Sequence, residues 1–112
     1  MRELGIVRIQ NDVIGRIASI AAREVSGVAG VWEGIRLGQG PPWFGGVKAR
    51  SLDAGLRIGL PIIAEYGVNL PRVAMQVQER VREAVHRMTD ISAIEVDVSI
   101  HGVREPRREG RP

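Results

Sequence analysis

Two imidazoles and a pair of neighbouring carboxylates are the side chains of this 112-residue chain whose types could support chemistry. His86 and His101 fall on the polar faces of a predicted helix and a predicted strand. A zinc-type site needs three or four ligands, often spaced i, i+4 on a helix. Arg82 stands four residues before His86, and only Asp90 follows at the same spacing. The spacing therefore predicts no metal site.

Glu95 and Asp97 lie two residues apart on one face of a predicted strand. Paired carboxylates work as acid and base when they are buried and coupled. These two alternate with apolar residues, which places them on the solvated face of the strand. The sequence contains no Gly-x-Ser-x-Gly motif, the usual setting of a serine nucleophile. It also contains no cysteine, which excludes thiol catalysis, disulfides and cysteine-bound metals. We therefore predict a protein that is not an enzyme, with no catalytic residue and no cofactor.

The segment 34–46 is predicted to be a loop, because five of its thirteen residues are glycine and two are proline. Its Gly38-Gln39-Gly40 begins a G-x-G-x-x-G pattern, but Trp43 replaces the third glycine and the prolines lack N–H donors, so we predict no nucleotide site. Trp43 and Phe44 either cover the open end of a sheet or contact a partner or a membrane surface.

Tyr66 belongs to a Glu-Tyr-Gly turn that joins a predicted strand to a predicted helix. Gly67 is expected to set the turn. The Tyr66 hydroxyl either makes a local hydrogen bond, as buried tyrosines do, or faces a partner. Trp43, Phe44 and Tyr66 are thus the three candidate partner-contact residues.

Two amphipathic helices must position these groups. The second has valines at every fourth position, begins near Pro71 and stops at Thr89-Asp90; the valines are Val73, Val77, Val81 and Val85. The first follows a cap at Asn11 or Asp12 and ends at Gly27, with an apolar stripe made of Val13, Ile14, Ile17, Ala18, Ala21 and Val25.

Five short strands are predicted, over 5–9, 28–33, 47–52, 56–62 and 94–100. Pro61 lacks a donor, which favours a sheet edge or a strand end. We predict an α+β fold: a two-layer sandwich in the order β-α-β-β-α-β, with two helices packed on one face of a mixed sheet. Residues 1–103 form one domain, and 104–112 form a disordered Arg-rich tail.

The net charge of +3 comes mainly from the ends, because residues 5–103 carry eleven basic and ten acidic groups. A nucleic-acid-binding domain more often carries its basic excess on a folded face. Nucleic acid is therefore an unlikely partner, although the order of elements keeps a KH-like RNA-binding or regulatory module as the alternative. The apolar runs are far shorter than the roughly 20 residues of a membrane span, and no secretory signal is evident, so we expect a cytoplasmic protein.

The order and spacing of several short pieces resemble the alkaline-shock-protein family of envelope stress response proteins of Gram-positive bacteria. The pieces are Gly5-Ile-Val-Arg-Ile-Gln, Val13-Ile-Gly-Arg-Ile-Ala, Ala21-Ala-Arg-Glu-Val, Gly27-Val-Ala-Gly-Val, Gly46-Val-Lys, Glu65-Tyr-Gly-Val, Pro71-Arg-Val-Ala, Val77-Gln-Glu-Arg-Val, Met88-Thr, Val96-Asp-Val and Gly102-Val. Thr89-Asp90 stands where the family usually has Thr-Gly, and Asp tolerates the left-handed turn acceptably.

The resemblance implies a non-enzymatic protein of the cell-envelope stress response or of envelope homeostasis. It further implies homo-oligomers and docking to a protein partner that is membrane-anchored. The chain itself would then be membrane-associated only through that partner, with no direct membrane span.

Overall fold

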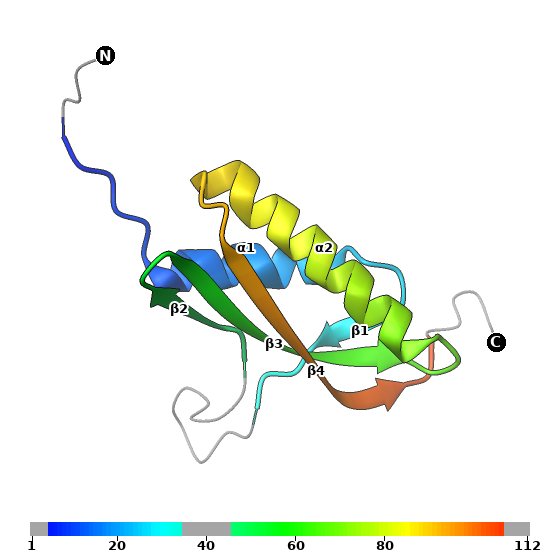
Figure 1. The fold of residues 1–112 in the computed structure, drawn as a ribbon. Helices are drawn as coiled ribbons and strands as arrows, with labels where there is room; N and C mark the ends of the chain where they lie inside the picture. Colours follow the sequence, from blue (N-terminus) through cyan, green and yellow to red (C-terminus); the bar gives the residue numbers. More distant parts are fainter. Residues whose placement is uncertain (1–4, 35–45, 107–112) are drawn as a thin grey trace, which may run out of the picture.

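Strand β3 (Gly55–Glu65) runs through the middle of the fold, and each of the other three strands pairs with it (Figure 1). The computed structural model describes residues 5–34 and 46–106. β2 (Lys48–Leu52) runs antiparallel to the first half of β3, and β1 (Val28–Val31) runs antiparallel to its second half. β1 and β2 thus share one edge of the central strand.

β4 (Ile94–Arg104) occupies the other edge of β3 and runs parallel to it. Parallel neighbours need a crossover connection, and helix α2 (Leu70–Thr89) supplies it. The sheet is therefore mixed, as the sequence predicts. Helix α1 (Asn11–Arg23) packs over β1 and β2, while α2 packs against α1 and over β4 (Figure 1). The predicted α+β sandwich with both helices on one face of the sheet is confirmed.

The core forms where the apolar stripes of the helices meet the inner face of β3. Each of the main aliphatic residues is at most 5% exposed; they are Val73, Val77, Val81 and Val85 of α2 and Leu56, Ile58, Leu60 and Ile62 of β3. Burial of a side chain of this size contributes about 1.5–3 kcal/mol. No charged or polar residue of the described chain is buried among them.

Helix α2 begins and ends where its local sequence predicts. The Asn69 side chain accepts a hydrogen bond from the Arg72 N–H at 2.9 Å, and Pro71 lies in the first turn. Asp90 caps the other end in the left-handed conformation, with φ of 64°. The prediction that Asp90 tolerates this turn is confirmed.

Helix α1 begins differently from the prediction. Asn11 is its first helical residue instead of its cap, and Gln10 precedes it without any side-chain capping bond. The Asn11 Oδ1 accepts a hydrogen bond from the Ser51 hydroxyl of β2, at 3.4 Å. The predicted cap at Asn11 or Asp12 is therefore wrong, because the amide side chain bonds a strand.

The predicted first strand at 5–9 does not form. Residues 5–10 are exposed, belong to no helix or strand, and run away from the body of the protein (Figure 1). A strand needs a neighbour for its backbone groups, and these residues have none in the described chain. The order of the described elements is consequently α-β-β-β-α-β, with four strands.

Pro61 lies in the central strand, so the expectation of an edge is wrong. Its carbonyl accepts a hydrogen bond from the Trp32 N–H at 2.9 Å. The N and C=O of one strand residue point to the same side, so the missing donor faces the gap between the end of β1 and the start of β2. The proline therefore costs no ladder bond.

Strand β4 extends through Arg104. The boundary between domain and tail, expected after residue 103, is therefore one residue too early. Residues 107–112 of the expected tail lie outside the described chain, and its disorder stays a prediction.

Candidate interaction site on the open face of the sheet

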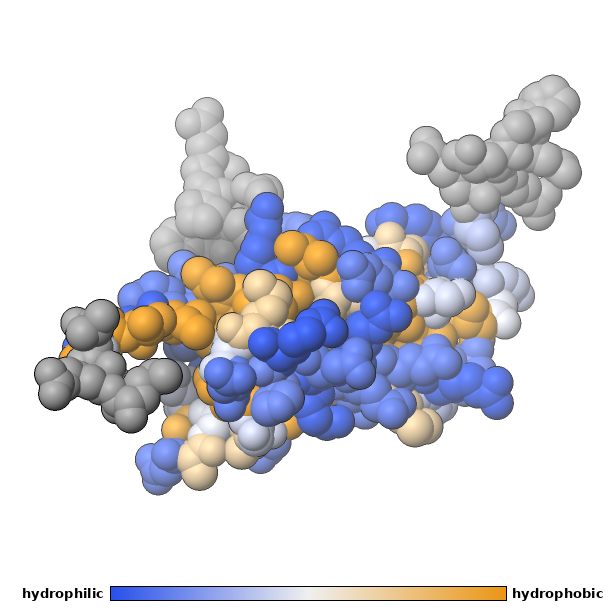
Figure 2. Space-filling view, turned by 90° about the horizontal axis from the view of Figure 1, so that it is seen from above, coloured by the Kyte–Doolittle hydropathy of each residue, from blue (hydrophilic) through white to orange (hydrophobic). Residues whose placement is uncertain are grey.

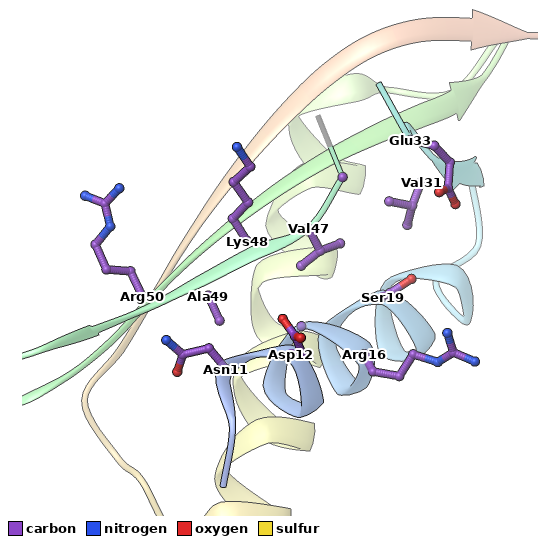
Figure 3. A pocket seen from close by; sticks show the side chains of 12 residues that line it. Asn11, Asp12, Arg16, Ser19, Val31, Glu33, Val47, Lys48, Ala49 and Arg50 are labelled. Carbon is purple, nitrogen blue, oxygen red and sulfur yellow. The ribbon is translucent and has the colours of Figure 1, made fainter. Parts of the chain in front are cut away.

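The strand register arranges the polar residues of the uncovered sheet face in rows. One row crosses β2, β3 and β4 as Arg50, Arg57 and Glu95, and the next crosses them as Lys48, Gly59 and Asp97. Paired residues project to the same side of a sheet. Figure 3 shows the Lys48 and Arg50 side chains pointing away from α1, on the side opposite the helices. Charges from three strands therefore meet on one face.

An ion pair joins two residues of the Arg50–Arg57–Glu95 row. The Arg57 Nη2 and the Glu95 Oε1 lie 3.0 Å apart, and the two side chains are 48% and 58% exposed. An exposed pair of this kind contributes about 0–1 kcal/mol. Glu95 is thus engaged by Arg57, and the structure confirms that Glu95 and Asp97 lie on the solvated face.

The Lys48–Gly59–Asp97 row contains a hollow. Gly59 has no side chain, so an open depression of about 360 Å³ lies between the base and the acid. Its floor continues over Pro61, and Trp32 and His101 line one end of it. The hollow therefore combines an apolar floor with a basic group on one flank and an acidic group on the other.

An aromatic stack forms the wall of this hollow. The Trp32 and His101 ring centroids are 4.4 Å apart, with 10° between the ring planes. Trp32 is held by its backbone, since its N–H donates to Pro61 and its carbonyl accepts from the Gly46 N–H at 3.0 Å. The Ser99 hydroxyl lies 2.9 Å from the His101 Nε2 and orients the imidazole. The histidine predicted to lie on a polar strand face serves as a packing surface there.

His86 has a structural contact at the end of α2. Its Nδ1 lies 3.0 Å from the Ile91 carbonyl oxygen, in the turn that leads to β4. The described residues hold no group of three or more histidine, aspartate or glutamate side chains that could bind a metal.

Two other polar side chains of α2 bond the outer edge of β4. The Gln78 amide donates to the Val96 carbonyl at 3.1 Å, and the Arg82 Nε donates to the Ile94 carbonyl at 3.2 Å. These bonds tie α2 to the edge of the sheet, because β4 offers carbonyls within reach of both side chains.

A second hollow, of about 510 Å³, lies between α1 and β2 (Figure 3). Asn11, Asp12, Arg16 and Ser19 line it from the helix. Its lining combines acidic and basic side chains with small residues, in no arrangement typical of a catalytic site. It borders Gly46, next to residues outside the described chain, and we build no site on it.

Of the three candidate contact residues, Tyr66 belongs to the described chain, and it does not line the open-face hollow. Tyr66 is 71% exposed, so the reading of a buried tyrosine is wrong, although its backbone N–H donates to the Arg104 carbonyl at 2.8 Å. Trp43 and Phe44 lie outside the described residues. A role for any of them in partner contact stays a prediction.

Sequence reasoning missed the residues that line the hollow: Trp32, Lys48, Gly59 and Pro61. Trp32 is partly buried, and its stacking partner lies 69 residues further along the chain, beyond the reach of any local pattern. The available signal was the alternation of β3, whose polar face carries Gly59 and Pro61 in place of larger side chains.

None of the described helices is both long and apolar enough to cross a bilayer.

Comparison with known proteins identifies the family. The alkaline-shock-protein 23 family, whose description is a cell envelope-related function, matches residues 1–105. The uncharacterized protein YqhY of Bacillus subtilis is 38% identical over 107 residues, which are 90% of this chain and 78% of that protein. The stress response regulator gls24 homolog of Streptococcus pyogenes is 28% identical over 106 residues, 89% of this chain and 59% of that protein.

Solved structures with the same fold include forms of MamM CTD. A zinc form has a TM-score of 0.52 at 22% identity, covering 90% of this chain and 93% of that chain. Identity this low establishes the fold and nothing about binding. The family match over residues 1–105 and the 38% identity to YqhY establish that the chain belongs to the alkaline-shock-protein 23 family, a family with a cell envelope-related function.

Proposed function

We propose that this protein is a non-enzymatic interaction module of cell-envelope homeostasis or the envelope stress response. In this proposal it works in the cytoplasm by self-association and by docking to a membrane-anchored protein. The observation that carries the proposal is the family match over residues 1–105, with its cell envelope-related description. The name of the Streptococcus pyogenes relative, a stress response regulator homolog, supports the same assignment.

The contacts of the polar side chains support a non-catalytic role. Glu95 pairs with Arg57, His101 stacks on Trp32, and each contact holds two segments of the sheet together. Catalytic acids and bases, by contrast, need a position within hydrogen-bond reach of the group that reacts. Glu95 and His101 thus serve as contacts between strands, which supports a non-catalytic role.

The open-face hollow is the surface that best fits a partner protein. Its apolar floor over Pro61 suits an aliphatic or aromatic side chain, and its flanks at Lys48 and Asp97 suit an acidic and a basic group. Interfaces typically combine a desolvated centre with a charged rim of this kind. A peptide segment with an apolar residue between opposite charges therefore matches it.

The experiment combines co-purification with a charge reversal. The full chain, with and without Lys48→Glu, is used to capture membrane proteins from a detergent extract, and the captured proteins are identified by mass spectrometry. Arg72→Glu, an equal charge change on the helical face, is the control. We expect Lys48→Glu to reduce capture while Arg72→Glu leaves it unchanged.

Self-association is tested separately, by light scattering on the purified wild-type chain at increasing concentration. A strictly monomeric protein at millimolar concentration would refute that half of the proposal. Equal capture by the two charge-reversal variants would remove the hollow as the docking surface. Hydrolysis or transfer of any substrate by pure protein would refute the non-enzymatic role.

A further inference from the structure

The segment Gly5–Gln10 has the sequence of a strand but no strand neighbour. Three of its residues are β-branched and exposed: Ile6 is 81%, Val7 is 88% and Ile9 is 38% exposed. Figure 2 shows hydrophobic atoms in the stretch adjoining the grey N-terminal residues. An unpaired segment with this composition is prone to add to the edge of a sheet. We call residues 5–10 the arm.

The sheet offers a matching edge on β4, which pairs only with β3 in the described chain. The Leu56 N–H donates to the Ala93 carbonyl, which therefore points toward β3. Backbone groups alternate in direction along a strand, so those of Ile94, Val96, Val98 and Ile100 point away from β3. Side chains of α2 reach the first two of these carbonyls, at Ile94 and Val96. Val98 and Ile100 come next, and both are only partly buried.

We propose that the arm of one copy adds as a fifth strand to the outer edge of β4 in a second copy. This inference rests on the self-association in the proposed function and names the surfaces that produce it. Alternation places Val7 and Ile9 on one face of the arm and Arg8 on the other. The two aliphatic residues then extend the layer of Val98 and Ile100.

Charge selects β4 over the other free edge of the sheet. With Val7 and Ile9 beside Val98 and Ile100, Arg8 lies on the open face opposite Ser99 and diagonal to Asp97, and opposite charges on neighbouring strands attract. Beside β2, the same arginine would lie next to Lys48 and Arg50, both basic. The arm therefore fits the acidic edge and is repelled by the basic one.

The arm cannot make this contact within its own chain. Asn11 is bonded to Ser51 of β2, on the far side of β3 from β4. Reaching the outer edge of β4 means crossing three strand spacings, about 14 Å, which uses about four of the arm's residues. Too few residues remain to pair. A head-to-tail contact follows, and such contacts build open chains unless the rotation closes a ring.

Cysteine pairing tests the contact directly, because the natural sequence has no cysteine. A chain with Arg8→Cys is mixed with a chain carrying one of Glu95→Cys, Asp97→Cys or Ser99→Cys, and mixed disulfides are counted. The matched controls carry Lys48→Cys or Arg50→Cys on β2. Because a disulfide needs Cα atoms about 4.4–6.8 Å apart, we expect the most product with Ser99→Cys, which faces position 8, less with the two carboxylate positions, and none with β2.

A charge swap gives an independent readout by light scattering. Arg8→Glu and Asp97→Lys should each weaken self-association, by roughly two- to fivefold. The double variant should recover most of the loss. Arg8→Glu would instead strengthen association if the arm sat on the basic β2 edge.

The outcomes separate this inference from the proposed function. Self-association of the wild type without β4 disulfides, or with no response to Arg8→Glu, overturns the arm contact and leaves the proposed function intact. A wild-type chain that is monomeric at all concentrations overturns both.

Discussion

The Trp32 indole stacks on the His101 imidazole at a centroid distance of 4.4 Å, and this contact joins segments from opposite sides of the central strand. Trp32 follows β1, whereas His101 lies in β4, and these two strands pair only with β3. The stack thus bridges β3 on the open face of the sheet, where no helix packs.

Removing either ring should therefore lower the stability of the fold. We expect Trp32→Ala to lower the free energy of unfolding by about 1.5–3 kcal/mol, and His101→Ala by less, because the indole buries more area. The double variant should show a coupling energy of about 0.5–1.5 kcal/mol in urea denaturation. Strictly additive losses would mean that the rings do not interact in solution.

A charge in the core and a charge near the free edge of β4 should differ in effect. Val81 is fully buried, so Val81→Asp buries an unpaired carboxylate and should abolish cooperative folding. Val98 is only partly buried, so Val98→Asp should leave a folded but weakened domain. Circular dichroism during thermal unfolding measures both. A cooperative transition in Val81→Asp would contradict the core assignment.

Two glycines of β3 should differ in their tolerance of alanine. A Cβ at Gly55 would meet the backbone carbonyl of Ala93 and lie 2.7 Å from the Ala93 Cβ. At Gly59 the nearest atom is the Lys48 carbonyl oxygen at 3.9 Å, an ordinary contact. We expect Gly55→Ala to cost about 2 kcal/mol or more and Gly59→Ala to be neutral within about 1 kcal/mol. Equal denaturation midpoints would refute the close approach of β3 to the Ala93 turn.

The cap of α2 should improve when its residue is made glycine. Asp90 holds φ at 64°, a conformation that costs a non-glycine residue about 1–2 kcal/mol. Asp90→Gly should therefore raise the free energy of unfolding by about 0.5–1 kcal/mol, and Asp90→Ala should lower it. Chemical denaturation of the pair is the measurement. A loss of stability in the glycine variant would show that the Asp90 side chain contributes a contact that outweighs its strain.

The sequence by itself determined the features that depend on near neighbours. The valine spacing of α2, its stop at Asp90 and the alternation of β4 are all read within a few residues, since helix and strand periods bring those side chains onto one face. The family resemblance is also carried by the sequence and is confirmed over residues 1–105. Local pattern failed at residues 5–9, because a strand also needs a neighbour that no local rule supplies.

Only the tertiary structure decided what the open face contains. Lys48, Gly59 and Asp97 form one row because β2 and β4 take one particular register on β3, and a shift of one residue would turn their side chains to the other face. Trp32 and His101 meet for the same reason, from positions 69 residues apart in the chain. Register is set by the packing of the whole core, so the hollow, the stack and the free edge of β4 emerge only when both layers are in place.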